Sequence, residues 1–501
     1  MNSYRKYLIA VILIVLSILL VSGEESAFTR IDEPSRLTQS LPTRPYAETP
    51  GSPGDFSLYL PLAFERYPPP RPVFGIQMSA ISESGGLSKV VEAQTAWVGG
   101  IVINWAEVEP TRGERNWQAL ATQEQYLQNA ANNDLTPIVL VRYTPQWARK
   151  YPSIACGPMA STHFEAFADF MHDVVARYSQ APYNAKYWEI WNEPDIDPDL
   201  VPSNSPYGCW GDADDPYYGG GYYADMLKVI YPRMKQADPE AQIMVGGLLL
   251  DCDPHNPPAA DPENPSGVRK DCTPAKFLEG VLLNDGGAFF DGVSFHAYDY
   301  YAGALGRYAN GNWASAWNTT GPVIIAKKNY IQNLLHSYGA TDKFLVNTES
   351  ALLGDGYTDD SIFEETKAYY LTQSYAIAIA EGLKSNLWYS LLGWRNSDLI
   401  DANHDPRPAY EAYTFSSQTL RSVYKVEELG PADVDSLSGL KGYKFNSDNG
   451  EVWILWSLDG ATHTVTLMPG TPTAIFDAFG NPQATGHTIN VGLKPLYLKW
   501  E

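Results

Sequence analysis

Between residues 73 and 422, short apolar runs alternate with segments whose apolar residues recur at helical spacing, and this alternation can be followed eight times. Two of the helical segments cover residues 165–179 and 222–237. Strands that are joined through helices form parallel sheets, so eight such units predict a (β/α)8 barrel, the TIM barrel of the α/β class. The expected strands are residues 73–78, 100–105, 137–143, 187–192, 242–249, 292–298, 344–348 and 385–391.

The pattern changes beyond residue 422. Short apolar runs there are separated by turn signals such as Asp448-Asn449-Gly450. Because this spacing is typical of antiparallel strands, residues 423–501 are expected to form a small C-terminal β-sandwich, interpreted as structural, with sugar binding as the alternative. The expected strands are residues 442–445, 451–458, 462–467, 473–476, 488–491 and 496–500.

Residues 1–23 have the features of a secretory signal peptide. Two basic residues precede an apolar run over residues 8–21, and small residues follow that run. The run is short for a membrane-spanning helix, although an uncleaved N-terminal anchor is the alternative. Residues 24–72 are rich in proline and are expected to form an extended linker. The sequence therefore predicts a protein that is secreted, or held at the cell surface by its N-terminal segment.

The four cysteines fit an oxidising compartment. Cys252 and Cys272 bracket a proline-rich insertion and would close it into a loop, which leaves Cys156 and Cys209 to join the loops after the third and fourth strands. The other two ways of pairing four cysteines stay open. The spacing lacks the paired pattern of a zinc site, so no metal is expected.

Charge and aromatic content narrow the classes of partner. The formal net charge of −23 argues against nucleic acid, whose phosphates require clustered Lys and Arg. The chain also has 14 Trp and 33 Tyr, more than cores alone usually use. Aromatic rings bury apolar area against the C–H faces of sugars, so this surplus suits a carbohydrate partner. The oligomeric state stays open.

Residues 187–195 form an aromatic, β-branched run that ends in Asn192-Glu193-Pro194. Pro194 cannot donate to a sheet ladder, so pairing should stop there and leave Glu193 at the carboxyl end of a strand. In parallel barrels, reactive groups project from that end. The alternative is that Glu193 is a rim charge paired with a neighbouring arginine.

A second apolar run, residues 344–348, is followed by Glu349. Two glutamates at strand ends can face each other across the mouth of a barrel. At a separation of about 5 Å, one can protonate a glycosidic oxygen while the other attacks the anomeric carbon, which is the geometry of a retaining glycosidase.

At these motifs the chain resembles clan A of the retaining glycoside hydrolases. In that clan an Asn-Glu pair ends the fourth barrel strand and carries the acid/base, and a glutamate that ends the seventh strand is the nucleophile. The resemblance implies that Glu193 is the acid/base, that Glu349 is the nucleophile, and that neither a metal nor an organic cofactor is needed. Two alternatives stay open: a barrel that binds carbohydrate without cutting it, and a transglycosylase on the same scaffold.

The resemblance also implies a set of substrate-binding residues. His296 and Tyr298 share the polar face of the sixth strand, and the clan places such a tyrosine against the nucleophile and such a histidine beside the sugar. The amide of Asn192 would bind the sugar 2-hydroxyl, provided that the strand ends or bulges there, and Trp388 would be the sugar platform. Candidates for further subsites are Trp105, Trp147, Trp394, Tyr143 and Tyr300.

One departure from the clan concerns an arginine. Several clan families carry an arginine on the second strand that pairs with the nucleophile, but the run here is Ile101-Val102-Ile103-Asn104-Trp105. Arg142, near the end of the third strand, is the candidate for supplying that charge instead.

Overall fold

The computed structural model describes residues 72–196, 208–212, 214–255, 272–302, 313–317, 319–354 and 361–500. The predicted signal peptide or anchor, residues 1–23, lies outside the described residues, as does the predicted linker except for its last residue. Within the described ranges, no helix combines the length and the apolar character needed to cross a membrane.

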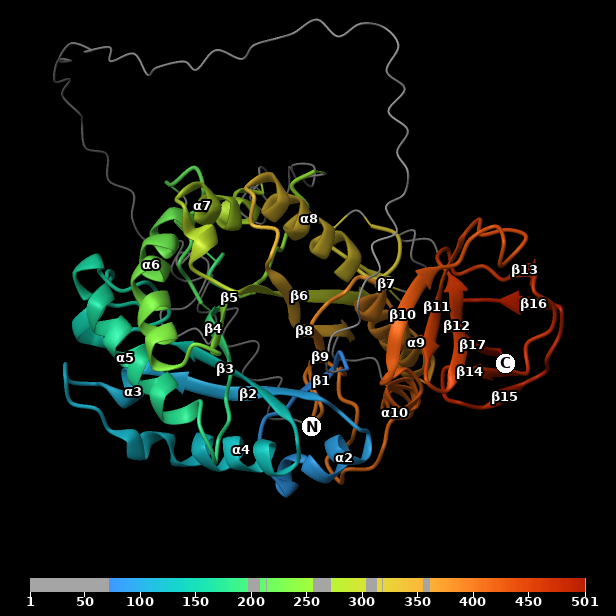
Figure 1. The fold of residues 1–501 in the computed structure, drawn as a ribbon, viewed down its shortest axis with the longest axis horizontal. Coiled ribbons are helices and arrows are strands. Elements are labelled where there is room, and N and C mark those ends of the chain that lie inside the picture. Colours follow the sequence, from blue (N-terminus) through green and yellow to red (C-terminus); the bar gives the residue numbers. More distant parts are fainter. Residues whose placement is uncertain are drawn as a thin grey trace, which may run out of the picture. The chain divides into compact units, whose positions relative to one another are not determined.

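Eight parallel strands close into a barrel, which confirms the predicted TIM-barrel fold (Figure 1). The ring is closed because the first strand pairs with both the second and the last. A short ninth strand, β7 (Trp313–Ala314), adds antiparallel to the end of the sixth. The barrel strands are β1 (Phe74–Gln77), β2 (Trp97–Asn104), β3 (Thr136–Arg142), β4 (Tyr187–Asn192), β5 (Gln242–Leu248), β6 (Gly292–Tyr301), β8 (Phe344–Leu353) and β9 (Ser385–Trp388).

Helices surround this ring of strands in Figure 1. The predicted helical segments 165–179 and 222–237 correspond to α5 and α6. The α-helices are α2 (Leu87–Glu92), α3 (Trp105–Val108), α4 (Ala121–Asn132), α5 (Phe164–Tyr178), α6 (Gly220–Ala237), α7 (Phe277–Leu283), α8 (Ile324–Ser337), α9 (Ser361–Ala380) and α10 (Pro408–Leu420). Pro408 is the first residue of α10, where its fixed φ fits the helix and its missing N–H is not needed.

The interior of the barrel is apolar at its amino-terminal end and polar at its carboxyl-terminal end. Trp97, Tyr187 and Phe344 are the first residues of their strands and belong to one buried interior cluster. The ring centroids of Trp97 and Tyr187 lie 4.8 Å apart, and those of Tyr187 and Phe344 lie 6.2 Å apart. These large rings fill the amino-terminal end of the barrel. Polar side chains lie farther along the strands, at the carboxyl-terminal mouth.

The C-terminal strands form the expected antiparallel sandwich. One sheet has the order β10-β11-β12-β17-β14-β15, and β13 pairs with β16 in a second. Strands β10 and β15 were absent from the sequence prediction, because β10 is largely exposed and polar and β15 has only two residues. The strands are β10 (Val423–Glu428), β11 (Leu440–Ser447), β12 (Gly450–Ser457), β13 (His463–Thr466), β14 (Ala474–Asp477), β15 (Pro482–Gln483), β16 (Thr488–Val491) and β17 (Leu496–Trp500).

Both faces of the larger sheet are packed. Along β12, Ile454 and Trp456 belong to the same apolar cluster as the barrel core, whereas Trp453 and Leu455 belong to the sandwich core. This alternation is the period of a strand with two buried faces. The hydroxyl of Tyr497 lies 2.7 Å from Ser416 Oγ on α10. The sandwich therefore packs directly on the helices that flank the last barrel strand.

Both predicted disulfides are present. Cys156 pairs with Cys209 with a Cα–Cα distance of 5.4 Å, and this bond joins the segments that follow β3 and β4. Cys252 pairs with Cys272 at 5.5 Å. Most of the insertion that the second bond brackets lies outside the described residues.

Candidate active site

Glu193, His296 and Glu349 meet at the carboxyl-terminal mouth of the barrel. His296 Nδ1 lies 2.8 Å from Glu193 Oε1 and 3.5 Å from Glu349 Oε2. One carboxylate oxygen of each glutamate and this ring nitrogen all lie within 4.8 Å of one another. The structure therefore brings together the two carboxylates that the sequence singled out, with an imidazole in contact with both.

The end of β4 departs from strand alternation, which directs both Asn192 and Glu193 into one pocket. Trp191 and Glu193 have positive φ angles of 73° and 44°. The indole of Trp191 points toward α5, where it packs on Phe167, and its Nε1 donates to Cys156 O at 2.7 Å. Because Trp191 is turned to the outside, the next two side chains both face inward. This is the bulge that a sugar-binding role for Asn192 required.

Two adjacent glycines on β5 make room for this arrangement. A Cβ on Gly246 would lie 2.0 Å from the carbonyl oxygen of Trp191, and a Cβ on Gly247 would lie 2.2 Å from His296 Nε2. The Gly247 carbonyl also accepts the backbone N–H of Glu193 at 2.9 Å. The left-handed turn of β4 and the position of the imidazole therefore both depend on the absence of side chains here.

Glu349 is held by a hydroxyl and by neighbouring charges. Tyr298 Oη donates a hydrogen bond to Glu349 Oε2 at 2.5 Å. Burial raises the pKa of Glu349 to about 7; the charge of His296 opposes this shift, and the negative charge of Glu193 adds to it. Two carboxyl groups at this separation do not both ionise easily, which is why the negative charge of Glu193 shifts the pKa of Glu349 upward.

His296 is fully buried and carries a positive charge at neutral pH. Burial alone would lower its pKa, but the charges of Glu349 and Glu193 outweigh burial and raise the pKa to about 9. The sequence predicted that this histidine lies beside the sugar. The structure places it against both glutamates, where it supplies a positive charge next to them, and its place beside a sugar stays a prediction.

Glu189 is a third carboxylate in this region, and the sequence did not single it out. It lies on β4, two residues beyond the interior ring of Tyr187, so alternation directs it into the barrel. Thr348 Oγ1 donates to Glu189 Oε1 at 2.9 Å. Burial raises the pKa of Glu189, and the charge of His296 opposes that shift. An acidic residue on the inward face of an otherwise apolar strand was the signal that could have identified it.

These groups open into a pocket of about 580 Å³. Among the predicted binding residues, Asn192, Tyr298 and Trp394 line it. Gln77 and Tyr389 also line it, although the sequence had not suggested them. The lining residues are Gln77, Met78, Ser79, Gly100, Val102, Ile138, Leu140, Arg142, Glu189, Asn192, Glu193, Tyr298, Glu349, Tyr389, Ser390, Leu392, Gly393 and Trp394.

Two of the predicted sugar-binding tryptophans, Trp388 and Trp105, are fully buried, and a third, Trp147, packs against Trp105. Trp388 is fully buried and its Nε1 donates to Ser397 O at 2.7 Å, so the pocket wall is formed by the next residue, Tyr389. Trp105 is fully buried against α5 and donates to Glu109. Trp147 packs edge-on against Trp105, and its Nε1 donates to Glu109 O at 2.9 Å. The fully buried rings of Trp388 and Trp105 have no face left for a sugar, whereas Trp147 is half-buried and its role in a further subsite stays a prediction.

Arg142 lines the pocket, but it does not provide the positive charge next to Glu349. Its guanidinium lies over the ring of Tyr143 at 4.7 Å, and its Nε donates to Asn104 Oδ1 at 3.4 Å. The cation next to Glu349 is His296.

The same three donor atoms, from Glu193, His296 and Glu349, are close enough together to ligate a metal ion. A metal would require a neutral imidazole with a free lone pair. Here the pKa of His296 is raised to about 9, and Tyr298 donates to Glu349. A metal at this site would therefore have to displace the proton of the imidazole.

No protein-family model matches this sequence, and a search of curated proteins gave no match. Solved structures share the fold. A family 39 glycoside hydrolase from Bacteroides cellulosilyticus matches with a TM-score of 0.63 and 19% identity over 86% of this chain and 81% of that one. A monomeric β-xylosidase from Caulobacter crescentus has a TM-score of 0.53 and 12% identity over 87% and 98% of the two chains. A GH30 endoxylanase from Clostridium papyrosolvens has a TM-score of 0.53 and 11% identity over 87% of this chain and 98% of that one. At these identities the likeness extends to the fold.

Proposed function

We propose that this protein is an exported retaining glycoside hydrolase that cleaves O-glycosidic bonds of oligo- or polysaccharides by double displacement. The observation that supports this most strongly is the distance between the glutamates, whose nearest carboxylate oxygens lie within 4.8 Å of each other. A retaining pair needs about 5 Å, whereas an inverting pair needs about 6.5–9.5 Å to leave room for a water molecule. The two disulfides support export.

In the first step Glu349 attacks the anomeric carbon while Glu193 donates its proton to the leaving oxygen. The hydroxyl of Tyr298 orients the attacking carboxylate and favours its ionised form against the effect of burial. As Glu193 loses its proton, its new negative charge faces the His296 cation at 2.8 Å. This contact is stronger after proton transfer than before it, so it favours the transition state over the bound substrate.

In the second step the roles of the pair are reversed. The ester on Glu349 carries no charge, so Glu193 can act as the base that removes a proton from water. The hydroxide attacks the anomeric carbon from the face opposite to Glu349, and the carboxylate leaves. Two displacements at one carbon restore the original anomeric configuration.

Two other functions predict different behaviour. A barrel that only binds carbohydrate would gain nothing from burying two carboxyl groups side by side, since their desolvation is costly. A transglycosylase would use the same first step and pass the sugar to an acceptor hydroxyl. Adding acceptor sugars and measuring the ratio of transfer to hydrolysis distinguishes a transglycosylase from a hydrolase.

The test uses aryl glycosides, beginning with β-xylosides because two of the structurally similar proteins are a β-xylosidase and an endoxylanase. Removing either glutamate, as Glu349→Ala or Glu193→Ala, should abolish ordinary hydrolysis. Azide should then rescue both variants. With Glu349→Ala it should give a glycosyl azide of inverted configuration, because only one displacement occurs. With Glu193→Ala the glycosyl azide should have retained configuration, because both displacements occur.

Glu107→Ala is the matched control, since Glu107 is an exposed glutamate at the barrel mouth whose carboxylate accepts from Asn104. It should leave turnover unchanged. Unimpaired hydrolysis by Glu349→Ala would rule out the assigned nucleophile, and no turnover by the wild-type protein on a broad glycoside panel would favour the binding protein.

A further inference from the structure

Residues 389–407, the β9–α10 loop, lie between β9 and α10 and form one wall of the pocket. The loop contributes Tyr389, Ser390, Leu392, Gly393 and Trp394 to the lining. Trp394 is the most open of the rings there, with 42% of its surface exposed. Its centroid lies 5.8 Å from that of Tyr389 and 5.9 Å from that of Tyr298.

The backbone of this loop is strained immediately after Trp394. Arg395 and Asn396 have φ angles of 49° and 62°, in the left-handed region that non-glycine residues seldom adopt. Two consecutive residues of this kind persist only where the surroundings hold them. Something outside the loop must therefore fix the conformation that presents Trp394 to the pocket.

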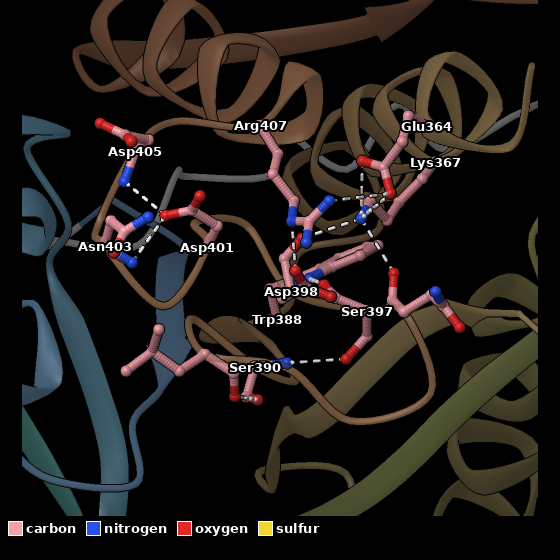
Figure 2. A network of polar contacts seen from close by, with 12 residues as sticks. Glu364, Lys367, Trp388, Ser390, Ser397, Asp398, Asp401, Asn403, Asp405 and Arg407 are labelled. Atoms are coloured by element: carbon pink, nitrogen blue, oxygen red, sulfur yellow. Dashed lines mark hydrogen bonds and ion pairs between the residues drawn. The ribbon is translucent and has the colours of Figure 1, made fainter. Parts of the chain in front are cut away.

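Lys367 on α9 is in position to do this. Its side chain is fully buried, and its ammonium donates to Asn396 O at 2.9 Å, to Asp398 O at 2.8 Å and to Glu364 Oε1 at 3.0 Å (Figure 2). All three N–H donors of the ammonium are used. Two of them bind carbonyl oxygens of the loop, one of which belongs to a strained residue.

Neighbouring contacts complete the attachment. Trp388 Nε1 donates to the carbonyl of Ser397 at 2.7 Å, so three consecutive carbonyls of the loop are bound. Ser397 Oγ accepts the backbone N–H of Ser390 at 3.2 Å. Arg407, at the end of the loop, forms an ion pair with Asp398 and lies 3.8 Å from Glu364 (Figure 2).

We propose that Lys367 is a positioning residue that fixes the β9–α10 loop and thereby holds Trp394 as a sugar-binding ring at the pocket. This rests on the proposed glycosidase function. Burying an ammonium is costly, and packing α9 alone would be served by an apolar side chain of similar length. Lys367 binds backbone carbonyls of the loop just after Trp394. Lys367 therefore affects substrate binding through the position of the Trp394 ring.

The test compares kcat and KM for Lys367→Met, Trp394→Ala and the double variant on a saccharide that the wild type cleaves. Each single variant should raise KM by about tenfold, with kcat changed by less than about threefold, because a stacking surface is lost while the glutamates stay in place. In the Trp394→Ala background, Lys367→Met should add little, since residues that act through one another are not additive.

Lys328→Met is the matched control. Lys328 is also a buried lysine, on the adjacent helix α8, but it binds Glu381 at 2.7 Å rather than the loop. It should lower the thermal midpoint without raising KM. The proposal is overturned if Lys367→Met raises KM no more than Lys328→Met does, or if its effect multiplies fully with that of Trp394→Ala.

If Lys367→Met fails to fold, Arg407→Gln loosens the same loop from its more exposed end; it should raise KM, with the rise suppressed by Trp394→Ala, and an unchanged KM would overturn the proposal. If the wild type binds saccharide but does not cleave it, the proposed glycosidase function fails, and the same comparison is made with Kd in place of KM.

Discussion

The hydrogen bond from Tyr298 to Glu349 gives the sharpest prediction about the nucleophile. Replacing Tyr298 by phenylalanine removes the hydroxyl that donates to Glu349 Oε2 at 2.5 Å and leaves the ring in place. A hydrogen bond to a charged group contributes about 1.5–3 kcal/mol. Since about 1.4 kcal/mol corresponds to one pKa unit, the pKa of Glu349 should rise by about 1–2 units from its value of about 7.

The assay is the pH dependence of kcat/KM for Tyr298→Phe and the wild type. The acidic limb reports protonation of the nucleophile, so in the variant it should move to higher pH by those 1–2 units. Activity at pH 6 should then fall by about 10- to 100-fold, while activity at high pH recovers in part.

Tyr300→Phe provides the control, because Tyr300 lies two residues farther along β6 and 43% of its surface is exposed. The pH at which each limb of its profile falls should match that of the wild type, whatever the substitution does to KM. An acidic limb that stays in place in Tyr298→Phe, or moves to lower pH, would refute the role assigned to this hydroxyl.

Two further predictions concern His296 and its surroundings. The pH profile of wild-type kcat/KM should be bell-shaped. It should fall below about pH 7 as Glu349 takes up a proton and above about pH 9 as His296 loses its proton. A profile that is flat from pH 8 to pH 10 would contradict a catalytic need for the imidazolium. Gly247→Ala should displace His296, whose Nε2 would lie 2.2 Å from the new Cβ, and lower both kcat and stability, the latter by about 1–3 kcal/mol. Gly221→Ala, on α6 with no neighbour closer than 3.8 Å, should be neutral or stabilising by less than about 1 kcal/mol in chemical denaturation.

The barrel and its two glutamates were accessible from sequence because they depend on local patterns. Apolar runs at regular spacing identified the strands, and a strand that ends in Asn-Glu-Pro identified the carboxyl end of β4. The disulfide pairing followed because Cys252 and Cys272 lie close together along the chain. The His-x-Tyr pair on β6 followed from alternation of polar and apolar residues.

The parts that sequence missed depend on backbone conformation at strand ends. The left-handed φ of Trp191 changes which side chains face the pocket, and no local sequence pattern predicts it; the missing Cβ of Gly246 on the neighbouring strand leaves room for it. The predicted platform, Trp388, is fully buried and the next residue, Tyr389, lines the pocket, because alternation is not defined once a strand has ended. The anchoring of the β9–α10 loop by Lys367 is a contact between distant elements, which no local pattern encodes.

The proposed mechanism requires that the two carboxylates act as a nucleophile and an acid/base that together invert the anomeric carbon twice. Proton NMR of the first sugar released from an aryl glycoside, recorded before mutarotation, measures this directly. The separation of Glu193 and Glu349 predicts that the product keeps the anomeric configuration of the substrate. A product of opposite configuration would show that water attacks in a single step, and would contradict the assignment of Glu349 as the nucleophile.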